Sequence, residues 1–193
     1  MDQRTLIVLV LVVAILAIAG VVIVVYRKRR SQHLKQQFGP EYDRAVLERG
    51  GAAKAEMELI NREKRVQSFT IKALTAAERG RFAEQWSVIQ NRFVDDPAVA
   101  VSEAASLVNR VMAERGYPMA DFEQRAADVS VSYPSLVQNY RAAGVIVQRN
   151  GRGEAGTEDL RQAMVHYRSL FDELLGGPPT VDATRGVLHE RAS

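Results

Sequence analysis

The sequence contains no cysteine, which excludes disulfide bonds, thiolate catalysis and zinc–thiolate sites for these 193 residues. Histidine is almost as scarce, because only His33, His166 and His189 are present. The three histidines lie too far apart for a metal-ligand spacing, and none has neighbours that suggest a catalytic triad. We therefore predict no catalytic, cofactor-binding or metal-ligating residue, no cofactor, and a protein that is not an enzyme.

Lysine is absent after Lys72, and the charges divide the chain into two parts. Residues 27–74 contain twelve basic and six acidic side chains, whereas residues 75–176 contain eleven basic and fourteen acidic ones. The basic part lies close to the N-terminus, and the second part is mildly acidic. This distribution argues against nucleic acid as a partner.

Charge is also absent from residues 6–26, LIVLVLVVAILAIAGVVIVVY, whose only polar side chain is Tyr26. A helix of this length spans roughly 30 Å, the thickness of a bilayer's hydrocarbon core. The many β-branched residues do not favour a strand, because an isolated strand would leave its backbone groups unpaired in lipid. We predict a transmembrane helix over residues 6–26, after a short flank at residues 1–5.

A cleaved signal peptide is the alternative interpretation of this run, since Ala17-Ile18-Ala19 resembles a cleavage site. Cleavage there would leave an apolar N-terminus, and the run is longer than the usual apolar region of a signal peptide. The basic cluster, moreover, follows the run instead of preceding it: Arg27, Lys28, Arg29 and Arg30. Because basic residues favour the cytoplasmic flank, we expect the N-terminus outside and the C-terminal domain in the cytoplasm.

Residues 27–74 are predicted to form a basic membrane-proximal linker that is partly helical. Gly39-Pro40 should interrupt it, since a residue before proline disfavours the helical conformation, and Gly50-Gly51 should end a short helix. A longer helix is expected from Ala52 to about Leu74, with Glu58 and Arg62 paired at i,i+4. Apolar and polar residues alternate in SFTIKAL, which leaves open an extended segment at the end of this helix. The sequence also does not decide whether residues 52–74 pack on the bundle or form a stalk.

Residues 75–176 show the strongest helical periodicity and predict an antiparallel bundle of about five helices, so the fold class is all-α. Thr75 and Glu78 have the spacing of a capping box, and Asp96-Pro97 should start the second helix. Further helices are expected at about Met119–Val129, Ser135–Gln148 and from Thr157. Residues 177–193 are predicted to be a disordered tail. The predicted core consists of Phe82, Trp86, Ile89, Phe93, Val101, Val108, Met112, Phe122, Leu136, Tyr140, Leu160, Met164, Tyr167, Phe171 and Leu174.

Gly151, Gly153 and Gly156 match the spacing of a dinucleotide-binding fingerprint and precede a helix. That motif requires a strand before it and a βαβ unit around it, and neither is predicted here. We interpret the three glycines as a flexible turn. The acidic pairs Asp95-Asp96 and Glu158-Asp159 are interpreted as helix-capping residues, because the helix dipole favours negative charge at this end.

A run from Glu84 to Leu175 contains the motifs EQWSVIQNRFVDDPAVAV, ERGYP, SLVQNYRAAG and TEDLRQAMVHYRSLFDELL. It resembles a family of uncharacterised bacterial proteins that are often labelled only as membrane or secreted proteins. The resemblance covers about half of the chain and implies no activity for any residue. A secreted location would conflict with the orientation predicted from the basic cluster.

Taken together, these features predict a single-pass membrane protein whose helical domain acts as an interaction or scaffolding module. We expect the bilayer as one partner and a membrane-associated protein or a second copy of the chain as another. Two alternatives stay open: an envelope or stress-related protein with an extracytoplasmic domain, and an enzyme of unrecognised type that uses the acidic and arginine side chains of the bundle.

Overall fold

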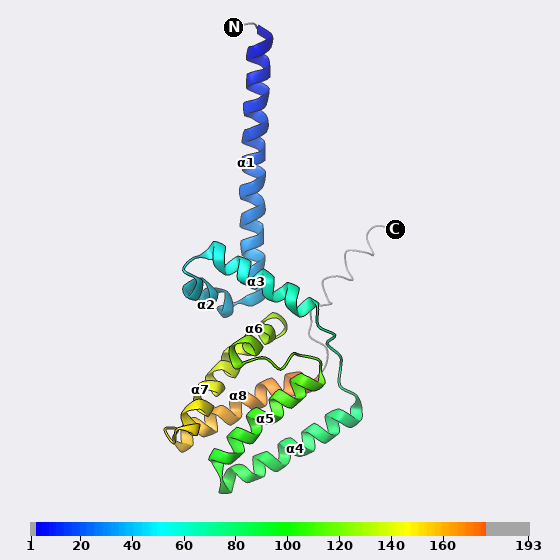
Figure 1. Ribbon diagram of the computed structural model, residues 1–193, viewed down its shortest axis with the longest axis vertical. Coiled ribbons are helices and arrows are strands. Elements are labelled where there is room, and N and C mark those ends of the chain that lie inside the picture. The colour runs from blue at the N-terminus through cyan, green and yellow to red at the C-terminus, as the bar shows by residue number, and fades with distance from the viewer. Residues whose placement is uncertain (1–2, 177–193) are drawn as a thin grey trace.

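The computed structural model describes residues 3–176, without the side chains of residues 3–10 and 13. The predicted tail at residues 177–193 and the first two residues lie outside this part. Within it there are eight helices and no strand, which confirms the all-α class. They are α1 (Gln3–Phe38), α2 (Pro40–Arg49), α3 (Ala52–Gln67), α4 (Ala76–Asp95), α5 (Pro97–Glu114), α6 (Phe122–Ser132), α7 (Val137–Gly151) and α8 (Thr157–Gly176). Helix α1 projects from a body formed by the other seven (Figure 1).

Helices α4 and α5 form a hairpin whose ends follow the predicted capping signals. Thr75 Oγ1 accepts a hydrogen bond from Glu78 N–H at 3.2 Å, and Glu78 Oε2 accepts one from Thr75 N–H at 2.7 Å. A single residue, Asp96, separates the two helices, and its side chain accepts a hydrogen bond from Val99 N–H at 3.1 Å. The capping box and the Asp96 cap were both predicted from the sequence, and both are confirmed.

The main core lies where α5, α7 and α8 pack together and α4 covers α5. Trp86 of α4 stacks on Phe171 of α8 with ring centroids 4.7 Å apart. All the residues of the predicted core lie in this cluster or against it, and only Phe93, Phe122 and Leu136 are half-buried. The apolar periodicity of the sequence thus marks the side of each helix that faces the core.

Helices α6 and α7 each begin and end two to three residues later than the sequence suggested. The side chain of Asp121 accepts a hydrogen bond from Gln124 N–H at 2.8 Å, so α6 starts at Phe122 instead of Met119. Helix α8 begins at Thr157, and Gly156 N–H donates to the side chain of Asp159 at 3.1 Å. Asp159, one of the acidic residues interpreted as helix-capping, therefore lies at the start of α8 and accepts a backbone hydrogen bond there.

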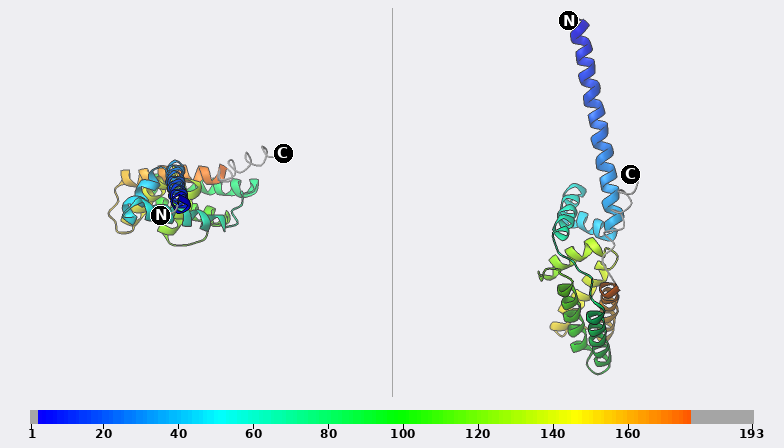
Figure 2. Two further views of the ribbon diagram at one scale, coloured as in Figure 1. Left: turned by 90° about the horizontal axis from the view of Figure 1, so that it is seen from above. Right: turned by 90° about the vertical axis from the view of Figure 1, so that its right-hand side faces the viewer.

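Residues 34–66 form a second, smaller core between α1, α2 and α3. Its members are Leu34, Phe38, Tyr42, Ala45, Ala55, Leu59, Val66 and Val131, the last of which comes from α6. Phe69 and Ile71 contact both cores. Residues 52–74 are therefore packed against the body, and the right-hand view of Figure 2 shows α1 rising directly from it.

Helix α3 ends at Gln67, and residues 70–75 are not helical, as the alternation in this segment allowed. Lys72 N–H donates to Arg115 C=O at 2.9 Å, which holds the segment against the end of α5. Gly116 has φ +96°, and a Cβ atom there would lie 2.3 Å from Thr70 C=O. Only glycine fits both the conformation and the close approach.

Candidate functional site

The upper part of α1 is an apolar helix that packs against nothing else in the described part of the chain. Large apolar side chains point outward all around it and are 44–66% exposed: Leu11, Val12, Ile15, Leu16, Ile18, Val21, Val22, Ile23, Val24, Val25 and Tyr26. The basic cluster Arg27–Arg30 follows and is also exposed. Burial begins only at Leu34, which is 2% exposed.

In the part of the chain that the structure describes, no helix combines the length and the apolar character needed to cross a bilayer. The side chains of residues 6–10 and 13, which belong to the predicted spanning run, lie outside that part. The transmembrane prediction for residues 6–26 therefore stays a prediction.

A buried charged network lies where α1 turns into α2. Gly39 separates these helices with φ +50°, and Pro40 opens α2. Glu41 therefore lies in the first turn of α2, facing the body, and only 1% of it is exposed. Carboxylates are favoured near helix N-termini, but full burial requires partners as well.

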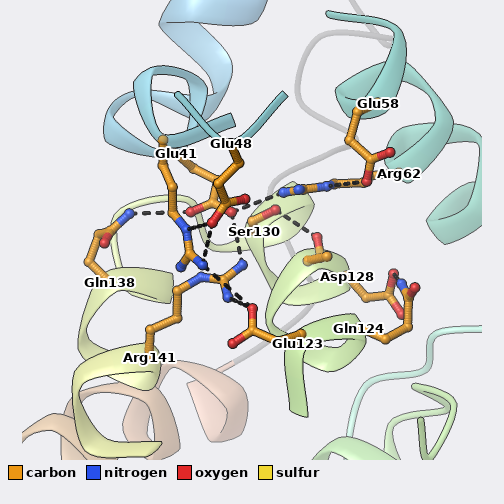
Figure 3. Close-up of polar contacts among 12 residues, drawn as sticks. Glu41, Glu48, Glu58, Arg62, Glu123, Gln124, Asp128, Ser130, Gln138 and Arg141 are labelled. Atoms are coloured by element: carbon orange, nitrogen blue, oxygen red, sulfur yellow. Dashed lines mark hydrogen bonds and ion pairs between the residues drawn. The ribbon is translucent and has the colours of Figure 1, made fainter. Parts of the chain in front are cut away.

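Three side chains from two other helices satisfy the Glu41 carboxylate (Figure 3). Its Oε1 accepts hydrogen bonds from Arg62 Nη1 at 2.9 Å and from Arg141 Nη2 at 3.0 Å. Its Oε2 accepts one from Gln138 Nε2 at 3.2 Å. Arg62 belongs to α3, whereas Arg141 and Gln138 belong to α7, so one carboxylate connects α2 and α3 to the bundle. We call Glu41, Arg62, Arg141 and Gln138 the Glu41 latch.

Each arginine of the latch also contacts a second carboxylate nearer the surface. Arg141 donates to Glu123 of α6, and Arg62 Nε donates to Glu58 at 3.2 Å. Arg49 also pairs with Glu58, at 3.1 Å. Burial by itself would raise the pKa of Glu58, but Arg62 and Arg49 hold it below its usual range. Glu58 therefore stays ionised in the folded protein at neutral pH.

A second ion pair supports the same junction from α3. Arg65 donates from Nε and Nη2 to Asp128 Oδ1 of α6, at 2.8 and 2.6 Å. Gln124 Nε2 donates to the same oxygen at 3.0 Å. Since Asp128 is almost fully buried, this contact also fixes the position of α3 on the bundle.

The latch is suited to holding helices together and not to chemistry. Arg49, Arg62 and Arg141 are matched by the carboxylates of Glu41, Glu58 and Glu123, so these six side chains have no net charge. The latch contains no histidine and no nucleophilic side chain. A buried network of this kind specifies how the helices dock, and removing Glu41 would leave two buried arginines without their shared counter-charge.

Sequence reasoning identified only one contact of this network, the i,i+4 pair of Glu58 and Arg62. Glu41 and Arg141 are separated by 100 residues, and no local pattern links them. The only local feature of Glu41 is that it precedes Tyr42, an aromatic residue of the same short helix. A charged residue beside a buried aromatic residue does not reveal its distant partner.

A third buried arginine, Arg115, lies at the C-terminal end of α5 and has no carboxylate partner among the described residues. Its Nη1 donates to Tyr133 Oη at 2.6 Å and to Leu174 C=O at 2.9 Å. Leu174 belongs to the last turn of α8, where unpaired carbonyl groups attract positive charge. Burial raises the pKa of Tyr133 to about 12, although Arg115 opposes this change.

The structure places the other sequence candidates away from any common site. Gly151 ends α7, and the other two glycines of that motif lie in the following loop, with a helix where the fingerprint requires a strand. His166 is half-buried in α8. Within residues 3–176, no three His, Asp or Glu side chains gather to hold a metal ion.

Comparisons with protein-family models, with curated proteins and with solved structures found no match for this chain. The resemblance of residues 84–175 to a family of bacterial membrane or secreted proteins is not tested by them.

Proposed function

We propose that this chain is a membrane-anchored helical interaction or scaffolding module without catalytic activity. Residues 6–26 would span the bilayer with the N-terminus outside. Arg27–Arg30 would lie at the cytoplasmic headgroups, and the helical body would present a surface to a partner in the cytoplasm. The partner would be another membrane-associated protein or a second copy of the chain.

The exposed apolar surface of α1 is the observation that carries this proposal. Side chains from Leu11 to Tyr26 are exposed on every side of the helix, and the helix projects away from the body. A continuous apolar surface of this kind is rare on soluble monomers and indicates contact with a membrane or a protein. The basic residues directly after it favour the membrane, because anionic headgroups attract them by about 1 kcal/mol each.

The absence of a recognisable catalytic set in the described residues supports a binding role. The main buried charges of the junction pair with each other in the Glu41 latch, and buried Arg115 donates to Tyr133 and to Leu174 C=O at the end of α8. These contacts hold the body in shape and leave its surface available for recognition.

Flotation with liposomes tests the anchor directly, using the full chain reconstituted from detergent. In the variant Ile15→Arg/Ile18→Arg, two arginines replace exposed residues in the middle of the run. The control variant Leu47→Arg/Met57→Arg introduces the same charges at exposed apolar positions of α2 and α3, which are 84% and 64% exposed. The wild type and the control should float. The α1 variant should stay at the bottom, since each central arginine costs roughly 2.5–3.5 kcal/mol of insertion free energy.

Two results would contradict the anchor. One is a wild-type chain that does not float at all, and the other is a wild type that forms a lipid-free oligomer through α1. Orientation requires a separate measurement, in which reporters active only in the cytoplasm or only outside it are fused after Ser193. An external signal would favour the alternative of an extracytoplasmic envelope protein.

A further inference from the structure

A groove on the bundle is lined by basic side chains from three separate segments. Lys72 comes from residues 70–75, Arg81 from α4 and Arg110 from α5. The groove has a volume of about 590 Å³ and is lined by Lys72, Arg81, Phe82, Gln85, Arg110, Ala113, Glu114 and Gly116. We call it the basic groove. It is opposite in charge to residues 75–176 as a whole, which have an excess of acidic side chains.

Two of its arginines differ from all the others in the bundle. Residues 75–176 contain eleven arginines. Nine of them donate a hydrogen bond to a carboxylate, carbonyl or hydroxyl oxygen of the described chain. The exceptions are Arg81 and Arg110, which have neither a hydrogen bond nor an ion pair there, and both line the basic groove. Arg81 contacts only the ring of Phe82, at 5.7 Å from its centroid.

The third basic side chain of the groove, Lys72, is held in place by contacts within the chain. Lys72 Nζ pairs with Glu114 Oε1 at 3.0 Å, and Lys72 N–H is bonded to Arg115 C=O at the end of α5. This ion pair is exposed, and exposed pairs contribute little stability, so an incoming carboxylate can replace Glu114 at low cost. The backbone approach at Gly116 keeps this wall of the groove in place.

A ligand that fits the groove should therefore supply negative charge for Arg81 and Arg110, which no carboxylate of the described residues neutralises.

We infer that the basic groove binds an extended acidic segment of a partner protein. Carboxylates spaced along such a segment can reach Arg81 and Arg110, which lie on different helices, and guanidinium groups bind carboxylates through paired hydrogen bonds. This inference rests on the proposed role as an interaction module and assigns the surface that recognises the partner.

Binding of a labelled oligoglutamate peptide to the full chain in detergent micelles tests the inference by fluorescence anisotropy. The test variant is Arg81→Ala/Arg110→Ala. The matched control is Arg152→Ala/Arg161→Ala, which removes two exposed arginines elsewhere in the bundle and changes the net charge equally. The test variant should lose roughly tenfold or more in affinity, because charge-assisted hydrogen bonds are lost, and the control should stay within about twofold of the wild type.

Three outcomes would overturn the inference: no binding of the peptide to the wild type, equal weakening in both double variants, or a groove that binds inorganic pyrophosphate through Arg81 and Arg110 but not the peptide. Flotation of the Arg81→Ala/Arg110→Ala variant should match that of the wild type. Failure of the anchor and failure of the groove are therefore distinguished by separate readouts.

Discussion

The carboxylate of Glu41 lies 3.0 Å from the guanidinium of Arg141, a residue 100 positions further along the chain, and both side chains are buried. This contact joins α2 to α7, and Arg62 completes it from α3. We therefore expect substitution of Glu41 to destabilise the fold more than substitution of a surface carboxylate.

Glu41→Gln should lower the free energy of unfolding by about 3–5 kcal/mol, because two buried arginines lose their shared counter-charge. Glu48→Gln is the control, since Glu48 pairs with Arg44 at the surface and should cost less than about 1 kcal/mol. Arg141→Met should lower the free energy of unfolding by an intermediate amount, because Glu41 keeps its ion pair with Arg62. Urea unfolding followed by circular dichroism measures all three, and equal effects of the two glutamate variants would show that the latch does not stabilise the fold.

Arg115→Met should change the free energy of unfolding by less than about 1 kcal/mol despite complete burial of the side chain. The substitution loses hydrogen bonds to Tyr133 and Leu174 but also removes a buried charge that has no carboxylate partner among the described residues. The same urea titration applies. A loss as large as that of Glu41→Gln would show that Arg115 has a counter-charge that the described residues do not include.

Two glycine-to-alanine substitutions should change the stability of the fold in opposite directions. A Cβ atom on Gly144 would lie 2.2 Å from Phe122 Cζ, whereas one on Gly80 would meet nothing within 4 Å. Alanine gains up to about 1 kcal/mol over glycine within a helix, but overpacking costs about 1–3 kcal/mol. We expect Gly80→Ala to raise the melting temperature and Gly144→Ala to lower it. A rise for both would mean that the Phe122 ring moves aside freely.

Alkaline pH should destabilise the fold through its buried tyrosines. Burial raises the pKa of Tyr133 from 10.0 to about 12, so the unfolded state loses this proton first. The contribution of protonated Tyr133 to the free energy of unfolding is complete below pH 10 and is lost as the pH rises towards 12. Tyr133→Phe should therefore be less stable at neutral pH, where it lacks the bond to Arg115, yet lose less stability between about pH 9 and about pH 11. Equal losses for the variant and the wild type would exclude Tyr133 as a source of the alkaline destabilisation.

Sequence periodicity predicted most of the bundle because core-facing residues recur at helical spacing, as Phe82, Trp86 and Ile89 do in α4. Local capping residues also set the starts of α4 and α5. The predicted start of α6 at Met119 was wrong, because the hydrogen bond from Gln124 N–H to the Asp121 side chain begins the helix at Phe122.

The junction could not be predicted in the same way. Glu41 and Arg141 look like ordinary surface residues until α2 and α7 come together, and no period in the sequence encodes such a pair. The extended segment before α4 was left open for a similar reason, because its position depends on Gly116 and Thr70, which are distant in the sequence.

The burial of the C-terminal turns of α1 restricts how the bundle can move relative to this helix. Leu34 and Phe38 are 2% and 0% exposed, so the last turns of the helix belong to the same packed unit as α2 and α3. A flexible tether would let the bundle sample a hemisphere whose radius depends on chain length. Here the bundle instead follows the tilt and rotation of α1, and the basic groove is held at one height along the axis of that helix. Partners would be selected by whether their acidic segments reach that height, as well as by their charge.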